Sequence, residues 1–218
     1  MPQKPGKYGI KFWILGDSKQ PYILNAKPYL GQQYDENRGE LQLGEHVVLK
    51  LMEPYYDSGY NVTTDSFFTS LRLSQKLLTK RTTLVGTLRN NWSEIPPALL
   101  QTQDRQVKSA MSLSNQECKV TLLSYKVKKN KVIHLLSTFH GCRDELAHLK
   151  PEIVQFYNET KGGVDTIDQM SRCYSTKAAS RRWPLQVFFN LLDLGGINAF
   201  TLFRVATNQP EASRREFL

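Results

Sequence analysis

The chain has few cysteines, fewer acidic than basic residues, and no segment typical of a secreted protein. Its three cysteines, Cys118, Cys142 and Cys173, lack the spacing of a disulfide framework, which suits a reducing compartment. Because no CxxC or HxxxH pair occurs, we do not expect a structural zinc site. The first seven residues contain no apolar run of the kind found in a signal peptide, and no internal repeat or low-complexity segment is present.

The charge balance favours an anionic partner. The 29 Lys and Arg residues outnumber the 20 Asp and Glu residues, so the formal net charge is +9 at pH 7. A basic balance of this kind suits nucleic acid first and an anionic membrane surface second. With 40% hydrophobic residues over 218 positions, the chain can bury a core in one domain or in one domain with an insertion.

Sequence periodicity predicts a mixture of strands and helices. Runs of β-branched and aromatic residues predict strands at residues 7–15, 21–25, 61–65, 82–88, 119–125, 132–138 and 151–157. Apolar residues at helical spacing predict helices at residues 44–51 and 71–78, and a further helix from Val164 onward. The first two strands are expected to form a hairpin, as are the fifth and sixth. Residues 95–114 are expected to be irregular.

A long apolar stretch covers residues 184–203. Polar residues and glycines interrupt it, so we expect a core helix rather than a membrane span. Pro184 suits the first position of this helix. The helix is predicted to be buried on most sides through Leu185, Phe188, Phe189, Leu192, Ile197, Phe200 and Phe203.

Acidic residues occupy two positions at which ligands often bind. The strand–helix–strand order over residues 61–88 predicts a right-handed crossover with parallel strands, which puts Asp65 at the carboxyl end of a strand. Asp165 and Asp168 follow two glycines at a helix start and lie three residues apart, on one helix face. Taken alone, this pair suits the helix dipole better than a metal or acid–base site.

Two basic segments are candidate phosphate contacts. Four lysines, including Lys128 and Lys129, lie between the two strands of the second predicted hairpin, where a solvated hairpin tip is the alternative interpretation. Arg181 and Arg182 precede the positive end of the last helix, which is unfavourable unless an anion lies nearby. A phosphate or a carboxylate would supply that anion, and a solvated basic loop remains the alternative.

Two long segments resemble the piggyBac-type transposases. They are NVTTDSFFTS at residues 61–70 and NETKGGVDTIDQM at residues 158–170. Shorter matching segments follow the same order: KYGIK (7–11), PYLG (28–31), VGTLR (85–89), EIP (94–96), LSYK (123–126) and RWP (182–184). The matches are long, collinear and spread over nearly the whole chain, so the resemblance is specific.

The resemblance implies an α/β fold with a ribonuclease-H-like core of the DDE/DDD transposase type, interrupted by an inserted β-rich domain. The first part of the core would cover residues 1–89, the insertion residues 90–152, and the C-terminal helical part of the core residues 153–218. Such enzymes excise and insert DNA by hydrolysis and strand transfer. They use two divalent ions, Mg²⁺ or Mn²⁺, that are held between three acids.

The resemblance also assigns roles to the acidic residues. Asp65 matches the second acid and Asp165 the third, and both would bind metal. Asp168 matches a further acidic position, for which we expect a supporting catalytic role. The family's first acid lies on a strand that would precede Met1. We therefore expect a core that lacks its first, central strand and a chain that is catalytically incomplete by itself.

DNA is the partner that the resemblance implies, both as transposon ends and as target. We expect a homodimer in the full-length protein, a nuclear location and no membrane partner. The candidate DNA contacts are Lys128, Lys129, Lys161, Lys177, Arg181 and Arg182. The alternative is a domesticated, non-catalytic protein that binds DNA through its basic surface. A structure-selective nuclease on the same fold would need the full acid set and is disfavoured.

Overall fold

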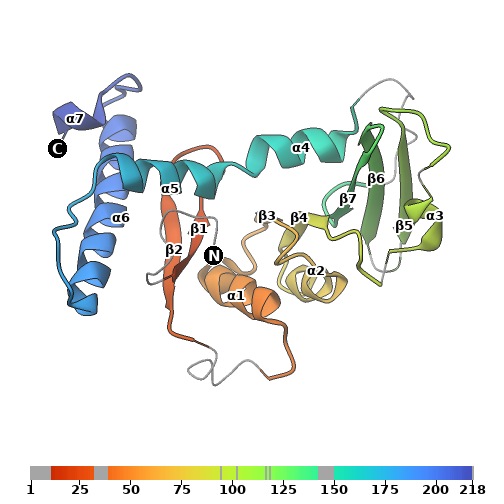
Figure 1. The fold of residues 1–218 in the computed structure, drawn as a ribbon, viewed down its shortest axis with the longest axis horizontal. Coiled ribbons are helices and arrows are strands. Elements are labelled where there is room, and N and C mark those ends of the chain that lie inside the picture. The colour runs from red at the N-terminus through yellow and green to blue at the C-terminus, as the bar shows by residue number, and fades with distance from the viewer. Residues whose placement is uncertain are drawn as a thin grey trace. The chain divides into compact units, whose positions relative to one another are not determined.

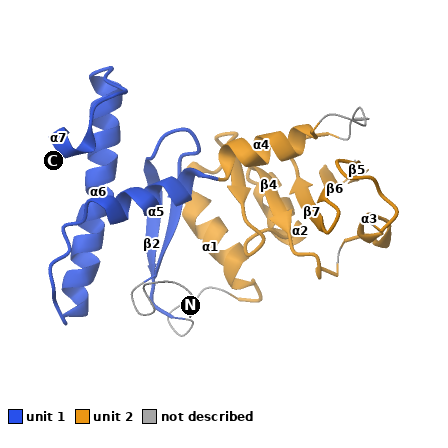
Figure 2. Ribbon diagram, turned by 45° about the horizontal axis from the view of Figure 1, so that its top comes forward, with its two compact units in different colours: residues 1–37, 162–218 blue, residues 38–161 orange. Residues whose placement is uncertain are grey.

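We describe the fold from a computed structural model of the chain (Figure 1). The structure describes residues 11–31, 39–93, 95–101, 103–115, 117, 119–141 and 150–217. These residues divide into two compact units, shown in different colours in Figure 2. Unit 1 contains residues 1–37 and 162–218, and unit 2 contains residues 38–161. Each unit is considered by itself below.

Unit 1 begins with the predicted hairpin. Strand β1 (Lys11–Gly16) pairs antiparallel with β2 (Ile23–Tyr29), which confirms the hairpin, while residues 7–10 of the expected strand lie outside the described residues. The turn between them is stabilised by Asp17, whose Oδ1 accepts hydrogen bonds from the N–H groups of Lys19 and Gln20 at 2.7 and 2.8 Å. A short polar side chain that bonds the backbone two residues on is typical of such turns.

Three helices complete unit 1: α5 (Gly163–Cys173), α6 (Trp183–Ala206) and α7 (Arg214–Phe217). The expected helix starts at Val164 and Pro184 are confirmed to within one residue. The core of the unit joins Ile23 of β2, Ile167 of α5, and Leu194 and Ile197 of α6. The Asn198 amide further ties α6 to β2, because it accepts from the N–H of Ile23 and donates to its carbonyl.

Helix α6 is far more exposed than its composition predicts. Ile197 and Phe200 are buried as expected, but Leu185, Phe188 and Leu192 are exposed. Every exposed position from Leu185 to Ala206 is apolar or glycine: Leu185, Phe188, Leu191, Leu192, Gly195, Ala199, Leu202, Val205 and Ala206. The polar residues of this helix instead face the rest of unit 1. Within the described part of the chain, α6 is also the helix that is long and apolar enough to cross a membrane, judged by length and composition only.

Unit 2 is built on a five-stranded mixed sheet with the strand order β3-β4-β7-β6-β5. Its strands are β3 (Asn61–Thr64), β4 (Thr83–Leu88), β5 (Ala110–Asn115), β6 (Val120–Lys128) and β7 (Lys131–Ser137). Strands β3 and β4 are parallel, and β6 and β7 form an antiparallel hairpin, as predicted. Strand β5 lies almost entirely in residues 95–114, which were expected to be irregular, so that expectation is wrong for β5; its alternation of Met111 and Leu113 with serines is short, and most of its residues are exposed.

Helices flank this sheet: α1 (Leu43–Met52), the 3-10 helix η2 (Glu53–Tyr55), α2 (Leu71–Leu78), α3 (Pro97–Leu100) and α4 (Glu152–Thr160). The predictions of α1 and α2 are confirmed, whereas the strand predicted at residues 151–157 is wrong. Ile153 and Val154 of α4 are buried against Val85, Leu123 and Leu135 of the sheet. This spacing fits one helix face, and Pro151 caps the helix start.

A buried carboxylate joins α1 to α2. Glu45 is 3% exposed, and its Oε1 accepts from Ser70 Oγ at 2.5 Å. Its Oε2 accepts from Nε and Nη2 of Arg72 at 2.9 and 2.6 Å. Ser70 in turn caps α2, since its hydroxyl accepts from the N–H of Leu73 at 3.0 Å. Burial raises the pKa of Glu45, but the bonds from Arg72 and Ser70 and the Arg72 charge outweigh it and hold this pKa below its ordinary value.

The lowered pKa predicts acid-sensitive stability. As pH falls below the ordinary value of 4.5, the unfolded chain takes up the Glu45 proton first, so the free energy of unfolding falls until the folded-state pKa is passed. Glu45→Gln removes this contribution and costs about 1–2 kcal/mol near neutral pH, a reduced figure because Arg72 is 42% exposed. Urea unfolding of both proteins across pH measures the difference. Parallel pH profiles for the two proteins contradict the assignment.

Candidate functional site

Asp65 opens a hydrogen-bonded turn between β3 and α2. Its Oδ1 accepts from the N–H of Phe67 at 2.8 Å, and its main-chain carbonyl accepts from the N–H groups of Phe68 and Thr69 at 3.1 Å each. The Thr69 hydroxyl donates to the same carbonyl at 2.8 Å. The carboxylate is exposed, and its Oδ2 has no partner among the described residues. The side chain therefore stands on a fixed backbone with one oxygen available to a ligand.

Close packing around this turn holds it in place. A Cβ atom at Gly44, at the start of α1, would lie 2.5 Å from the carbonyl oxygen of Phe67. A Cβ atom at Gly86 of β4 would overlap Thr69 Oγ1 and lie 2.6 Å from Thr64 Oγ1. Both glycines are thus needed for close backbone approach rather than for turn flexibility. The turn after β3 is fixed on both sides within unit 2.

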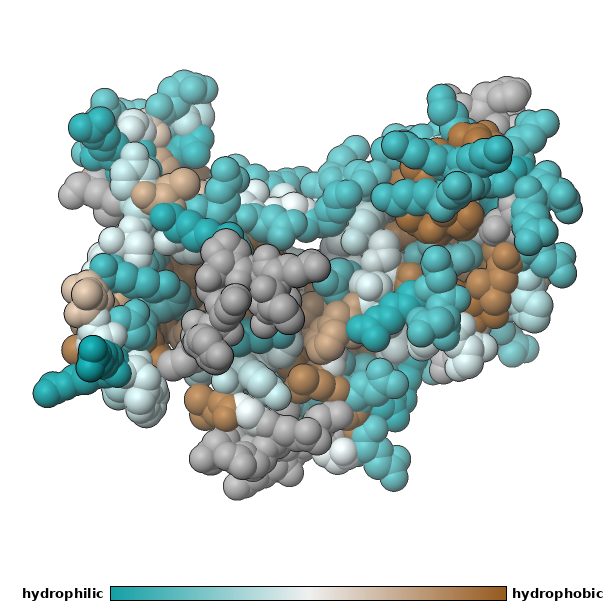
Figure 3. Space-filling model, in the orientation of Figure 1, coloured by the Kyte–Doolittle hydropathy of each residue, from teal (hydrophilic) through white to brown (hydrophobic). Residues whose placement is uncertain are grey.

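Lys161, a candidate DNA contact, follows an element that is tied to the same strand. The hydroxyls of Thr63 in β3 and Thr160 at the end of α4 lie 2.7 Å apart. Lys161 comes directly after Thr160, is exposed, and donates from Nζ to Asn158 Oδ1 at 2.9 Å. In Figure 3, hydrophilic residues cover most of the visible surface along α4. The fold thus brings a cation of α4 to the end of the strand that carries Asp65.

Asp165 lies in the first turn of α5, in unit 1, and is exposed. Its carboxylate has no hydrogen-bond or ion-pair partner among the described residues. The helix start is fixed by contact with the β1–β2 turn, because a Cβ atom at Gly163 would lie 2.5 Å from the carbonyl oxygen of Asp17. At Gly162 the same atom would meet nothing within 4 Å. The two glycines follow a helix, α4, and not the strand expected there.

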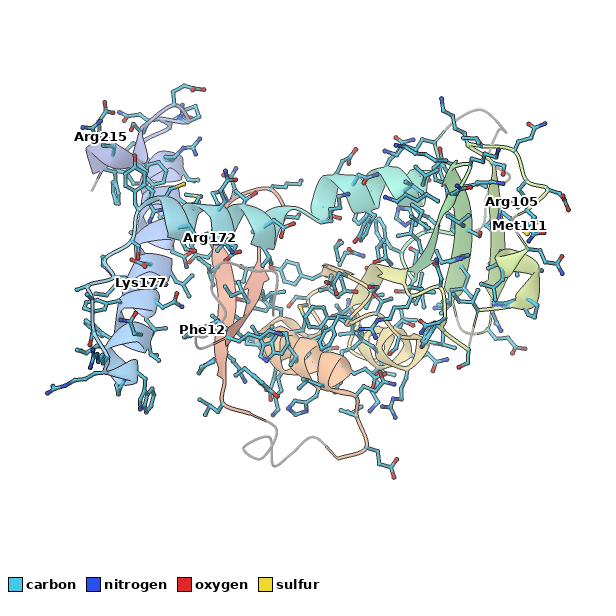
Figure 4. The ribbon with its side chains drawn as sticks, viewed as in Figure 1. Phe12, Arg105, Met111, Arg172, Lys177 and Arg215 are labelled. Carbon is cyan, nitrogen blue, oxygen red and sulfur yellow. The ribbon has the colours of Figure 1, made fainter. Side chains whose placement is uncertain are left out.

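Asp168 occupies the next turn of α5 and is engaged differently. Its Oδ2 pairs with Nη2 of Arg172, four residues later, and the two side chains are 54% and 65% exposed. An exposed pair at this spacing is worth only a few tenths of a kcal/mol, about 0.3–0.5. Figure 4 labels Arg172 on α5. The carboxylate of Asp168 is therefore already partnered, whereas that of Asp165 is not.

Asp65 and Asp165 fit a divalent cation by donor type. Carboxylate oxygens are the ligands that hard ions such as Mg²⁺ prefer, and each residue has at least one oxygen without a described partner. Asp65 belongs to unit 2, and Asp165 and Asp168 belong to unit 1. Within the described ranges, no group of three or more His, Cys, Asp or Glu side chains could hold a metal ion. The donor chemistry fits, at two positions of fixed backbone.

The hairpin lysines divide into two kinds. Lys128 and Lys129 are exposed at the turn between β6 and β7, as expected of phosphate contacts or of a solvated tip. Lys126 is 5% exposed, and its Nζ donates to the carbonyls of Gln103 and Arg105 at 3.3 and 2.7 Å. Lys126 therefore holds a loop and does not face a ligand, which corrects the reading of all four lysines as one group.

The remaining cations lie in the loop before α6. Lys177, Arg181 and Arg182 are exposed and make no ion pair with any described residue. Asp193 of α6, which sequence reasoning treated only as an interruption of an apolar stretch, is 3% exposed and bonds this loop. Burial raises the pKa of Asp193, but bonds from Ser175 and Thr176 outweigh it and lower the pKa overall. The sequence signal that could have identified this residue was an acid in the middle of a long apolar stretch.

The sequence of this chain is similar to those of several known proteins. A family model described as transposase IS4 matches residues 1–200. PiggyBac transposable element-derived protein 2 of Homo sapiens is 22% identical over 98% of this chain and 39% of its own length. PiggyBac transposable element-derived protein 3 of Homo sapiens is 23% identical over 95% of this chain and 37% of its own length.

A solved structure extends the comparison to three dimensions. The chain matches a piggyBac transposase, seen by cryo-EM in a synaptic complex with hairpin DNA, with a TM-score of 0.87 and 36% identity. The match covers all of this chain and 46% of that one. The family model, the relatives and this structure agree, and the family model assigns the chain to the transposase IS4 family. The chain belongs to the piggyBac-type transposase family. It spans less than half the length of each of these relatives.

The two glycines before Asp165 give a matched pair of substitutions. Gly163→Ala forces the backbone of α5 away from Asp17 and is expected to cost about 1–3 kcal/mol of unfolding free energy. Gly162→Ala adds the same atom in open space and is expected to stay within about 0.5 kcal/mol of the wild type. Urea unfolding compares the two variants. Equal effects contradict the close contact between α5 and the β1–β2 turn.

Proposed function

We propose that this chain is a DNA-binding part of a piggyBac-type transposase. The observation that carries the proposal is a set of exposed cations on elements with fixed backbone, none of which is paired to a described carboxylate: Lys128, Lys129, Lys177, Arg181 and Arg182. Lys161 belongs with them: its Nζ donates to the neutral amide of Asn158 and lies over the Tyr157 ring. The net charge of +9 and the family membership support DNA as the partner.

A ribonuclease-H-like core is the fold that we propose for the full protein. The open strand edges of each unit support it: among the described residues of unit 1, β1 pairs with β2 alone, and in the described part of unit 2, β3 is the edge strand of its sheet. We propose core segments at residues 1–89 and 153–218 and an insertion at residues 90–152, whose β7 continues the sheet from β4.

In the family reaction, DNA transposition by strand cleavage and transfer, we propose metal-binding roles for Asp65 and Asp165. A bound pair of Mg²⁺ or Mn²⁺ ions would activate the attacking oxygen and stabilise the leaving oxygen. Each of these residues supplies a carboxylate oxygen from a backbone that is fixed within its own unit, which lowers the ordering cost of binding a metal ion. We propose a supporting role for Asp168: its pair with Arg172 stabilises the part of α5 that follows Asp165.

We infer that Asp65 and Asp165 do not suffice for strand cleavage by themselves, whereas the basic residues suffice for DNA binding. The family resemblance calls for three acids, and two carboxylates leave a metal pair under-coordinated. A domesticated protein that uses only its basic surface is the alternative, and it predicts DNA affinity that ignores divalent ions altogether. Mg²⁺-dependent nicking that is lost in Asp65→Ala contradicts both versions.

We also propose that the protein works as a homodimer in the nucleus, where its DNA partner lies. The exposed residues of α6 support self-association. Leu185, Phe188, Leu192, Gly195, Ala199, Leu202 and Ala206 alternate at spacings of three and four, which is the pattern of a helix–helix seam. A solvent-exposed apolar stripe of this length calls for a covering surface.

DNA binding should depend steeply on salt. The slope of log affinity against log salt reports the number of phosphates contacted, at about −0.9 for each phosphate. Removing three contacts in Lys177→Gln/Arg181→Gln/Arg182→Gln should therefore reduce the slope by about 2–3. Fluorescence anisotropy with a duplex oligonucleotide at several salt concentrations measures this, and sedimentation of the complex reports its stoichiometry.

The control removes the same charge elsewhere. Lys76, Lys80 and Arg81 lie in and after α2 and are exposed, so their replacement by Gln changes the net charge equally. This variant should keep the wild-type slope to within about 1. Equal losses in the two triple variants would mean that binding is only a response to net charge. Undetectable binding at low salt contradicts the proposed function as a whole.

A further inference from the structure

The loop of residues 174–182 joins α5 to α6 and carries three exposed cations within six positions: Lys177, Arg181 and Arg182. Figures 1 and 2 both show it running alongside α6 before it turns into that helix, and Figure 4 labels Lys177 on it. A loop with this charge should be held apart by repulsion, and α6 adds the positive end of its dipole. Something must therefore hold the loop in place.

Asp193 makes the first attachment, from the third turn of α6. Its Oδ2 accepts from Ser175 Oγ at 2.6 Å. Its Oδ1 accepts from the N–H of Thr176 at 2.7 Å and from the Thr176 hydroxyl at 2.9 Å. Ser175 Oγ also accepts from the N–H of Lys177 at 3.2 Å, so the attachment extends to the first cation. Both oxygens of a buried carboxylate are thus used on the backbone and hydroxyls of one dipeptide.

Gln186 makes the second attachment, two helical turns earlier in α6. Its side-chain amide donates to the carbonyls of Ala178 and Ser180 at 3.3 and 3.2 Å. Ser180 Oγ accepts from the N–H of Arg182 at 3.1 Å. Side chains of α6 thus bond the N–H of Thr176 and the carbonyls of Ala178 and Ser180, while the cationic side chains are exposed.

Asp193 is buried, and its three hydrogen bonds all come from Ser175 and Thr176 of the loop. These bonds therefore hold the loop against α6. We propose that Asp193 is a positioning residue for DNA binding: it pre-orders the 174–182 loop so that its three cations meet the phosphate backbone without a further ordering cost. This inference rests on the proposed function and goes beyond it by assigning a role to an acid that never touches DNA.

For removal of Asp193, the proposal predicts a change in DNA affinity opposite to the one expected from net charge alone. Removing a negative charge from a DNA-binding protein should tighten binding. If Asp193 acts by position, Asp193→Ala instead releases the loop and weakens DNA binding about tenfold, since each cationic side chain must then be ordered on binding. Asp193→Asn makes the same charge change but keeps the bonds, because its oxygen accepts from Thr176 and its amide donates to Ser175 Oγ. It should bind at least as tightly as the wild type.

Two further variants serve as controls. Glu211→Ala removes an exposed carboxylate of unit 1 and should bind DNA slightly more tightly than the wild type. Ser175→Ala/Thr176→Val deletes both hydroxyl donors without touching α6 or the net charge, and should weaken binding in the same direction as Asp193→Ala. This double variant keeps the test valid if Asp193→Ala fails to fold, which circular dichroism reports.

Hydrogen exchange supplies a readout that needs no DNA. The Thr176 amide should be protected in the wild type and in Asp193→Asn, and should exchange rapidly in Asp193→Ala. Unchanged protection in Asp193→Ala overturns the anchoring role while leaving the proposed function intact. A released loop with unchanged or tighter DNA binding overturns the positioning role. If no variant binds DNA, the proposed function fails and the role of Asp193 fails with it, although the exchange data still report the anchor.

Discussion

The turn that carries Asp65 depends on one buried carboxylate, that of Glu45. Through Ser70 it fixes the N-cap of α2, and through Arg72 it holds the first turn of that helix against α1. The Asp65–Thr69 turn begins at β3 and ends at this cap, so both of its ends are set by the fold. The Glu45 carboxylate accepts a hydrogen bond from the capping residue Ser70 and also pairs with Arg72. Loss of Glu45 would therefore weaken the contact between α1 and α2 and the end of the turn together.

Unit 1 also contains a buried carboxylate that fixes a neighbouring segment through hydrogen bonds. Asp193 is buried and saturated with hydrogen bonds like Glu45, and it also fixes a segment that it does not belong to. Close contact does the same work at Asp165, where Gly163 lets α5 rest on the carbonyl of Asp17. In both units, exposed candidate side chains stand on backbone that is fixed by buried polar groups and glycines. Pre-ordered groups bind an anion or a metal ion with less loss of entropy.

The pattern of apolar residues predicted those helices and strands in which buried residues recur at regular helical or strand spacing. The β1–β2 hairpin, α1, α2, the parallel β3–β4 pair and the position of Asp65 after β3 are confirmed. Residues 151–157 were misread because Ile153, Val154 and Phe156 suit a strand by composition but pack on one face of α4. Asp193 and Gln186 could not be found by spacing, since their roles arise only when the loop folds back along α6. The apolar residues of α6 predicted a buried helix, but many of them are exposed in unit 1. Periodicity shows which residues share a helix face and not whether another element covers that face.

The central proposal is that Asp65 and Asp165 both bind divalent metal ions. When Fe²⁺ is bound in place of Mg²⁺, added hydrogen peroxide oxidises it to Fe³⁺ and yields hydroxide and a hydroxyl radical, ascorbate regenerates Fe²⁺, and the radicals cut the polypeptide next to the bound ion. The account predicts cuts beside residue 65 and beside residue 165 in the same sample, both suppressed by excess Mg²⁺ or Mn²⁺, the first also by Asp65→Asn and the second by Asp165→Asn. Cuts at only one of the two positions, or cuts that the matching Asn substitution leaves unchanged, would contradict the proposal that both acids bind metal.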